Sequence, residues 1–335
     1  MDFEQLYYGA QVKNPIKRAQ SQSGGLFTVF AEKIINGGGI VYGVQLDSQL
    51  KAVYGRADTL EELEPFKGSK YVQVDVQDTY HMVERDLVNE QLVLFSGTPC
   101  HVHGLQCYLR AKHICTAKLF TCDLICHGVP SPLVFRKHIE NISKHGDEIT
   151  EFRFRDKRFG WHSHIETYSK NNSSQKSEVW PAIFPSSLCM RESCYKCKYA
   201  SFLRFSDLTV GDFWGLDANY PEKDDNTGMS LVLVNSQKGN ILFNSIREDI
   251  HFFETEKVHC LQPQLKAPIS RPENRAEFWE DFRTKNFNFL VYRYVYHGTV
   301  GFLYSRIQKI CKNVGIYAYI HPVWMKLKIK FTGHR

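Results

Sequence analysis

Four cysteines at three places in the chain have the type and spacing to hold a metal ion or an iron–sulfur cluster. Cys100 and Cys126 each follow a short apolar run, whereas Cys194 and Cys197 form a C-x-x-C pair. Thiolates from two strand ends and one C-x-x-C loop are sufficient for a four-cysteine cluster, and zinc uses the same spacing. Spacing does not distinguish a [4Fe-4S] cluster from zinc, so both alternatives stay open at this point.

Strand and helix geometry separates these four residues from the other six cysteines. Cys122 and Cys126 are four residues apart on one predicted strand, so about 13 Å separates them, too far for both to ligate one compact cluster. Cys107 lies about two helical turns, roughly 10 Å, beyond Cys100. We therefore expect Cys122 to be a buried core residue and Cys107 to lie outside the site. Cys189 is a reserve ligand, and the isolated cysteines are expected to be structural: Cys115, Cys260 and Cys311.

The elements that must position these cysteines alternate between strand-like and helix-like segments in the first half of the chain. Strands are predicted at four ranges: 40–46, 51–54, 91–95 and 118–125. Helices are predicted at four ranges: 26–35, 79–89, 102–111 and 131–144. This alternation predicts an α/β core, and antiparallel strands expected after residue 150 make the sheet mixed (α+β). Carboxyl ends of parallel strands are where open α/β sheets place their sites, and Cys100 and Cys126 lie at such ends.

Composition and charge limit the class of protein. Hydrophobic residues make up 43% and charged residues 23% of the chain, which are ordinary globular values. The sequence has no secretory signal and no apolar run of about 18 residues that would span a membrane. Ten cysteines without a secretory signal favour metal or redox use in a reducing compartment over disulfides. We therefore expect a cytoplasmic protein, and no recognised motif supports nucleic-acid binding.

The net charge of +6 is concentrated near the C-terminus. No acidic residue follows Asp281, and the ten Lys and Arg beyond it leave the first 281 residues at 6 − 10 = −4. Close to the end, apolar residues alternate with Lys326, Lys328 and Lys330. This pattern fits an edge strand protected by lysines or peripheral contact with the anionic inner face of a membrane.

Six motifs occur together in an order that resembles the coenzyme F420 hydrogenase/dehydrogenase beta subunit family. They are SQSGGLF at 21–27, GSKYVQ at 68–73, GTPC at 97–100, CHGVPSP at 126–132, RDKRFGW at 155–161 and RESCYKCKYASFLRFSDLTVGDFWG at 191–215. The resemblance runs from about residue 8 to residue 250 and implies a domain over 8–250. A basic, aromatic-rich and mainly helical segment over 251–335 carries none of these motifs.

The resemblance implies an oxidoreductase that uses FAD and a [4Fe-4S] cluster. It assigns the cluster ligands as Cys100, Cys126, Cys194 and Cys197, in a cysteine-rich insertion beside the mixed sheet, and so favours a cluster over zinc. It also connects bacterial members with surface polysaccharide biosynthesis. Many relatives begin with a ferredoxin-like region, but this chain has no cysteine before Cys100. The expected electron donor is therefore a separate ferredoxin-type protein, or a reduced deazaflavin or nicotinamide.

Three glycine-containing segments are the expected contacts of the FAD. Glycines in Ser23-Gly24-Gly25 allow close backbone approach, and the helix that follows offers N–H groups to a pyrophosphate. Gly68-Ser69-Lys70, with the adjoining Tyr71, offers a hydroxyl and a cation. Gly97-Thr98 lies next to Cys100, where it could contact both flavin and cluster. An N-capped helix, a surface turn and a plain strand-to-helix turn are the simpler alternatives.

Two histidines are the best candidates for proton transfer. The unperturbed pKa of a histidine lies near neutrality, and His127 and His162 lie within the motifs or directly after one. A basic strand and turn near Trp161 could bind an anion. Its cations are Arg153, Arg155, Lys157 and Arg158. A strand face exposed to solvent explains these charges equally well. Asp207 and Asp212 bracket an apolar strand and are expected to fix turns rather than act as acids.

The main hypothesis is therefore a cytoplasmic flavin and iron–sulfur oxidoreductase that transfers electrons between a reduced cofactor and a substrate that the sequence does not name. A second interpretation is a non-catalytic scaffold protein stabilised by zinc at the same four cysteines. A third is an electron-transfer subunit of a larger complex that makes no substrate contact of its own. Homo-oligomers are compatible with all three.

Overall fold

The computed structural model describes residues 3–143, 147–296, 298 and 307. The chain forms two compact units, Met1–Arg271 and Pro272–Arg335, and each is described by itself. The predicted domain ranges, 8–250 and 251–335, stay a prediction. The alternating segment predicted around Lys326, Lys328 and Lys330 lies outside the described residues.

The first unit is built on a mixed eight-stranded sheet in the part of the chain that the structure describes. Its order is β11-β1-β10-β9-β5-β4-β2-β3. The strands are β1 (Leu6–Val12), β2 (Ile40–Leu46), β3 (Ala52–Ala57), β4 (Val93–Gly97), β5 (Leu119–Leu124), β9 (Leu208–Asp212), β10 (Ser230–Val234) and β11 (Ile250–Glu254). Strands β2, β4, β5 and β9 are parallel neighbours, and antiparallel strands flank them on both sides. The predicted mixed α/β fold is confirmed.

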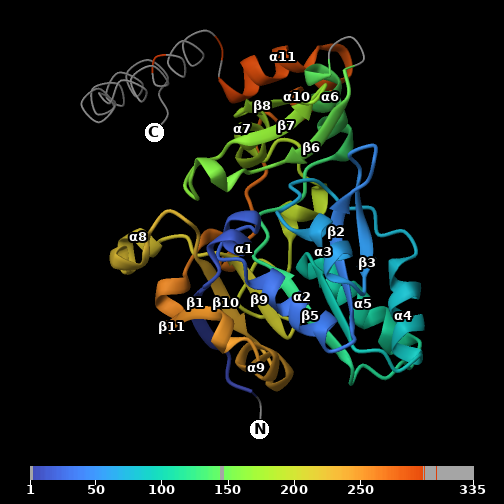
Figure 1. The fold of residues 1–335 in the computed structure, drawn as a ribbon. Helices are drawn as coiled ribbons and strands as arrows, with labels where there is room; N and C mark the ends of the chain where they lie inside the picture. The colour runs from blue at the N-terminus through green and yellow to red at the C-terminus, as the bar shows by residue number, and fades with distance from the viewer. Residues whose placement is uncertain (1–2, 144–146, 297, 299–306, 308–335) are drawn as a thin grey trace. The chain divides into compact units, whose positions relative to one another are not determined.

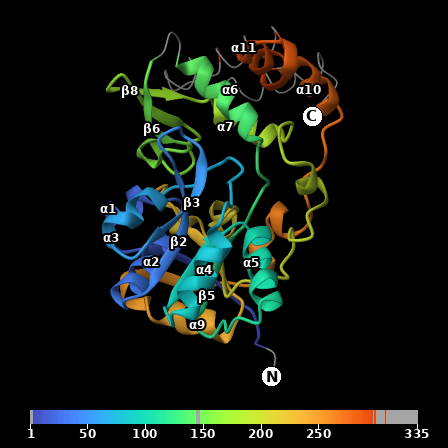
Figure 2. The ribbon, with the colours of Figure 1, turned by 90° about the vertical axis from the view of Figure 1, so that its right-hand side faces the viewer.

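Helices cover both faces of this sheet. Helix α2 (Leu26–Asn36) lies on one face, and α4 (Thr79–Val88) and α5 (Pro99–Ala111) lie on the other (Figure 2). Helix α9 (Gln237–Asn244) packs into the same core as α2. Because the helices bury both faces, the central strands are continuous apolar runs rather than alternating ones.

The side-chain alternation of the strands divides the core into two. On β4, Leu94 packs against the α2 side, whereas Val93 and Phe95 pack against α4 and α5. Cys122 on β5 is 0% exposed in the α2-side core, which confirms the prediction that it is a core residue. Cys100 lies in the first turn of α5, which begins three residues earlier than predicted.

Two helix ends follow from the local sequence. Helix α2 ends at Gly37, whose N–H donates to Ile34 O and Lys33 O. Helix α6 (Pro132–Ile142) begins after Ser131, whose hydroxyl accepts from Leu133 N at 3.2 Å. A proline at the first helical position costs no hydrogen bond there. Both ends were predicted from the sequence and are confirmed.

A smaller antiparallel sheet follows α6, with order β6-β7-β8 (Figure 1). Its strands are β6 (Ile149–Arg153), β7 (Glu166–Lys170) and β8 (Ser173–Ser177). Trp180 in α7 (Val179–Ile183) is fully buried here and contacts Phe135 with ring centroids 5.0 Å apart. The antiparallel strands predicted after residue 150 are therefore a separate layer from the main sheet.

Strands β1 and β11 were not predicted, although β1 pairs with both β10 and β11 inside the main sheet. Gly9 interrupts the apolar pattern of β1. A Cβ at this position would lie 2.3 Å from the Phe253 ring, so the glycine makes room for the neighbouring strand. The packing that requires this glycine comes from residues more than 240 positions away and is invisible locally.

The described residues of the second unit are mainly helical, as expected. They form α10 (Arg275–Thr284), α11 (Phe287–Leu290) and a π-helical turn, Val291–Val295. Arg293 donates to Asp281 at 2.7 Å and to Glu277 at 2.8 Å, so one of the ten C-terminal cations is paired within the unit. No helix among the described residues has both the length and the apolar character needed to cross a membrane.

The remaining short helices of the first unit connect these elements. They are α1 (Pro15–Gln20), α3 (Leu60–Leu63) and α8 (Leu216–Asn219). The loop between α1 and α2 and the loop after α3 carry two of the predicted cofactor-binding segments.

Candidate functional site

A cavity of ≈ 520 Å³ lies at the carboxyl ends of β4, β5 and β9, and we call it the strand-end cavity. Its walls come mainly from five stretches of the chain: 21–28, 66–74, 96–101, 124–129 and 210–214. Neighbouring parallel strands end at the same sheet edge, so the loops that follow them converge. The cavity therefore gathers segments that lie nearly 200 residues apart in the sequence.

The predicted cofactor-binding residues lie together at this cavity with one exception. Those that line it are Ser23, Gly25, Gly68, Ser69, Lys70, Tyr71, Gly97 and Thr98. The exception is Gly24, which packs against the main sheet, with its N–H donating to Ser230 Oγ at 2.9 Å. Gly25 has φ +86° and begins α2 without a side-chain cap, so no side chain blocks the helix N-terminus at the cavity wall.

Replacing Gly24 with alanine is expected to destabilise the fold by about 1–3 kcal/mol, because the core has no room for a methyl group there. The added Cβ would lie 2.2 Å from Ala10 O and 2.8 Å from Ser230 N, which are backbone atoms that cannot rotate away. Urea unfolding followed by circular dichroism measures the effect. A variant with an unchanged midpoint would contradict the close packing of the 23–25 turn on β1 and β10.

Lys70 fixes the shape of the second predicted segment. Its ammonium donates to Pro65 O at 2.7 Å, Lys67 O at 2.9 Å and Gly68 O at 3.0 Å. Burial, and secondarily the charge of Arg153, lowers the pKa of Lys70 to about 7. The segment at 68–70 is therefore a loop closed around a lysine rather than an ordinary surface turn.

Asp212 joins three segments at the cavity. Its carboxylate accepts from Ser23 Oγ at 2.5 Å and Trp161 Nε1 at 2.7 Å, and it forms an ion pair with Arg155 at 2.5 Å. The Asp212 and Arg155 side chains are only 10% and 3% exposed. Asp212 was expected only to fix a turn, but its carboxylate also connects the 23–25 turn to the basic segment that contains Arg155.

Trp214 provides an aromatic face at the cavity, and sequence reasoning did not single it out. The residue is 39% exposed, and its ring stacks on Trp161 with centroids 6.0 Å apart. The Arg155 guanidinium lies 5.4 Å from the Trp214 centroid, and His164 is stacked at 6.2 Å. An exposed indole beside a fixed cation is suited to stacking against a flat conjugated ring.

His127 lines the cavity, as one of the two predicted proton-transfer residues. The Gln264 amide donates to its Nδ1 at 3.0 Å, which leaves the ring proton on Nε2, 3.2 Å from Ser187 Oγ. Burial lowers the pKa of His127, so the ring is neutral at physiological pH.

His162, the other candidate, does not line the cavity. Its Nε2 lies 2.8 Å from Asp224 Oδ2, and its side chain is 47% exposed. His101 does line the cavity and was missed. Burial, followed by the charge of Arg191, lowers its pKa to about 4, and its Nδ1 lies 3.1 Å from Tyr54 Oη. The position of His101 directly after Cys100 is the feature of the sequence that could have identified it as a site residue.

Backbone pairing holds the C-x-x-C segment against the loop that carries Cys126. Arg191 N donates to Val129 O at 3.0 Å, and Ser131 N donates to Cys189 O at 2.8 Å. A Cβ on Gly128, which has φ +147°, would lie 3.5 Å from the Cys194 Cβ. The two cysteine-bearing loops are therefore close neighbours at Gly128, where the positive φ favours glycine.

The four predicted ligands are close enough to influence one another. Burial first, and then the charges of Cys100, Cys194 and Cys197, raises the pKa of Cys126 to about 12. The described residues nevertheless contain no group of three or more His, Cys, Asp or Glu side chains arranged to hold a metal ion. Thiolates are the donors that an iron–sulfur cluster takes, and each cysteine of a [4Fe-4S] cluster binds its own iron rather than one shared ion.

The other cysteines differ in their surroundings. Cys107 is exposed on α5, 3.6 Å from His103 Nε2, and Cys115 is exposed. Cys189 and Cys260 are buried, and Cys311 lies outside the described residues. Cys126 is half-buried, and it differs from these cysteines because the charges of Cys100, Cys194 and Cys197 contribute to its raised pKa.

Comparison with known proteins agrees with the fold and with the sequence motifs. The sequence profile described as the C terminus of the coenzyme F420 hydrogenase/dehydrogenase beta subunit matches residues 90–259. A chain in the solved structure of the F420-reducing [NiFe] hydrogenase complex from Methanosarcina barkeri is similar, with a TM-score of 0.52 and 14% identity. The similarity covers 86% of this chain and 89% of that chain, and at this identity it shows a shared fold alone. No curated protein matches the chain.

The profile match spans half of the chain and includes the loops after β4, β5 and β9. Four of the six motifs that suggested the resemblance lie within it, together with all four predicted cluster ligands, and the GTPC motif begins seven residues inside its first boundary. The chain belongs to the coenzyme F420 hydrogenase/dehydrogenase beta subunit family, a family of redox subunits.

Proposed function

We propose that this chain is an FAD- and [4Fe-4S]-dependent oxidoreductase that transfers electrons between a reduced cofactor and a substrate. The main support for this proposal is the strand-end cavity, because both the predicted flavin segments and Cys126 line it. When bound, the flavin supplies two-electron chemistry and the cluster supplies one-electron steps.

The residues of the cavity suit a dinucleotide. The uncapped N-terminus of α2, preceded by Gly25, offers backbone N–H groups to the pyrophosphate. Trp214 and Arg155 offer a stacking face and a fixed positive charge to the isoalloxazine ring. Gly97 presents bare backbone at the cavity wall, where a Cβ would lie 2.1 Å from Tyr54 Oη.

The cysteine loops suit the cluster. Cys126 lines the same cavity as the flavin segments, and Cys100 is exposed in the first turn of α5. Cys194 and Cys197 are held beside Cys126 by backbone pairing of 129–131 with 189–191. We propose these four cysteines as the ligands because Cys126 lines the cavity and backbone pairing holds the loop of Cys194 and Cys197 beside it. The charge of Cys100 also contributes to raising the pKa of Cys126, in agreement with this proposal.

His127 is the proposed proton carrier. The ring is neutral and lines the cavity, and its Nε2–H donates to Ser187 Oγ. It can therefore accept a proton on Nδ1 if the Gln264 amide moves away. His162 is paired with Asp224 outside the cavity, so its part in the reaction is proposed only as that of a surface proton relay.

The electron donor is proposed to be a ferredoxin-type protein, or a reduced deazaflavin or nicotinamide. The similar solved chain belongs to a complex, which agrees with a partner for this chain too. We also propose a cytoplasmic location, with peripheral contact to an anionic membrane through the basic C-terminal segment. A role in surface polysaccharide biosynthesis is proposed as well.

Anaerobic purification with flavin, iron, sulfide and zinc analysis tests the proposal. The expected result is a brown protein with flavin absorbance and about four irons per chain. A colourless protein with one zinc per chain would overturn the redox function and support a zinc-stabilised scaffold. A protein that contains both cofactors but oxidises neither nicotinamide nor deazaflavin without a partner would be an electron-transfer subunit.

A further inference from the structure

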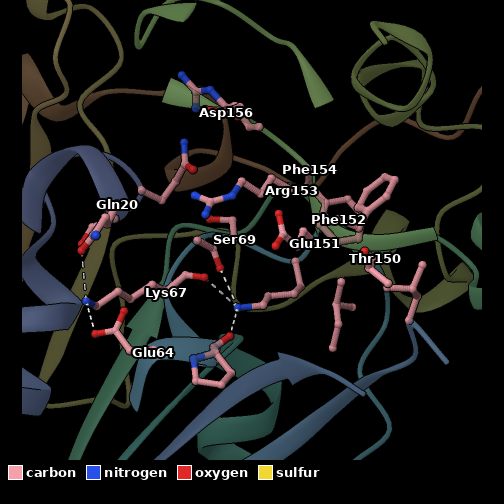
Figure 3. Close-up of a pocket in the computed structure, with 18 of the residues that line it drawn as sticks. Gln20, Glu64, Lys67, Ser69, Thr150, Glu151, Phe152, Arg153, Phe154 and Asp156 are labelled. Carbon is pink, nitrogen blue, oxygen red and sulfur yellow. Dashed lines mark hydrogen bonds and ion pairs between the residues drawn. The ribbon is translucent and has the colours of Figure 1, made fainter. Parts of the chain in front are cut away.

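A second cavity, of ≈ 600 Å³, lies next to the strand-end cavity, and we call it the bulge cavity. Its walls come from four stretches of the chain: 19–22, 46–50, 64–70 and 149–157 (Figure 3). Residues 67–70, Ser21, Gln22 and Arg155 line both cavities. The closed loop at 67–70 is therefore a shared wall between the proposed flavin site and a separate space.

The bulge cavity takes its name from an irregularity in β6. Ile149 and Thr150 pair with Lys170 and Ser169, but the register shifts before Arg153. Within the shift, Glu151 adopts φ +51°, a left-handed conformation that is strained for a non-glycine residue. Bulges redirect side chains and are frequent beside active sites. The strain is therefore located at the cavity wall.

The cations of this cavity are unequally neutralised. Lys67 lies 2.5 Å from Glu64 and 3.5 Å from Gln20 Oε1, so its charge is compensated (Figure 3). Lys70 donates only to carbonyl oxygens among the described residues. The Arg153 side chain is exposed in the cavity wall and makes no hydrogen bond or ion pair with any residue that the structure describes.

Arg153 and Lys70 are close enough to repel each other, because the charge of Arg153 contributes to lowering the pKa of Lys70. Two neighbouring cations that lack a carboxylate partner are a favourable place for an anion, which would relieve their repulsion. Glu151, Ser69 and Thr150 line the same cavity and offer hydrogen-bonding groups beside it. Together they suit a ligand that carries both an anionic group and hydroxyls.

We propose that the bulge cavity binds the phosphate or carboxylate group of a small hydroxyl-bearing molecule, with Arg153 as its principal contact. Lys70 adds a positive charge when its amine is protonated, and Glu151 accepts hydrogen bonds from the hydroxyls. Anion binding by the bulge cavity does not depend on the proposed redox function. The further step, that the bound molecule is the redox substrate and reaches the flavin across the 67–70 wall, rests on that proposed function.

Calorimetric titration of the full chain with glucose 6-phosphate, glucuronate and glucose tests the proposal, since the three share a sugar ring and differ in the anionic group. At least one anion is expected to bind, whereas glucose is not. Arg153→Gln is expected to weaken anion binding by about tenfold or more, equivalent to about 1.4 kcal/mol. Binding of glucose 6-phosphate alone identifies a phosphate site, and binding of glucuronate alone identifies a carboxylate site.

Arg136→Gln is the matched control, because it removes one positive charge from an exposed side chain on α6 whose ion pair with Glu140 is 3.8 Å long. It is expected to bind the anions as the wild type does. If neither anion binds the wild type, or if Arg153→Gln binds them equally well, the assignment is wrong. Flavin and iron contents measured on the same samples report on the redox function separately, so the two proposals can fail independently.

Discussion

Replacing Cys194 with alanine is expected to remove the iron–sulfur cluster and to lower electron transfer by more than about a hundredfold. The estimate follows because loss of a residue that only orients a ligand already costs about 10–100-fold in metal affinity. Cys194 lies in the loop that is paired with the Cys126 segment, and its thiol contributes to the raised pKa of Cys126. Iron and sulfide analysis after anaerobic purification, with electron paramagnetic resonance of the reduced protein, measures the loss.

Cys107→Ser is the matched control for this experiment. Cys107 is exposed on α5, two turns beyond Cys100, and its sulfur lies 3.6 Å from His103 Nε2. The control is expected to keep wild-type iron content and activity. A Cys194→Ala protein that retains full iron and sulfide would remove Cys194 from the ligand set and make Cys189 the next residue to test. The flavin should remain bound in both variants, because the flavin segments do not include either cysteine.

The elements around the site were predictable where the pattern is local. The strands that precede Cys100 and Cys126 are short apolar runs, and α2 ends at three glycines, so each could be located from its own sequence. The rule that sites lie at the carboxyl ends of parallel strands then placed the two cysteines at one sheet edge. These inferences need only side-chain periodicity and helix-stop signals, which a single chain displays.

The contacts that complete the cavity were not predictable, because they depend on the tertiary arrangement. Asp212 was expected to fix a turn, yet it accepts from Ser23, 189 residues away, and pairs with Arg155. Trp214 has no spacing that marks it, and His101 is marked only by its position directly after Cys100. The role of both appears only once loops from different strands converge. His162 resembled His127 in sequence, but pairing with Asp224 holds it outside the cavity lining.

Replacing Asp212 with alanine is expected to lower the free energy of unfolding by about 3–5 kcal/mol, because it leaves the buried Arg155 guanidinium without its carboxylate. The substitution also frees Ser23 Oγ and Trp161 Nε1, so the turn before α2 loses its link to the Trp161–Trp214 stack. We therefore expect the FAD dissociation constant to rise by about tenfold or more, equivalent to about 1.4 kcal/mol. Urea unfolding and a flavin fluorescence titration measure the two effects.

Asp123→Ala separates general destabilisation from loss of the site. Asp123 forms a still more buried ion pair with Arg204 at 3.0 Å, with both side chains 1% exposed, but it does not line the strand-end cavity. Both variants should lose comparable stability, and only Asp212→Ala should lose FAD affinity in its folded fraction. If the Asp123 variant weakens FAD binding equally, the effect of Asp212 is one of stability alone. If neither variant changes FAD binding, Asp212 does not organise the flavin site, and the link between Ser23 and Arg155 serves only the fold.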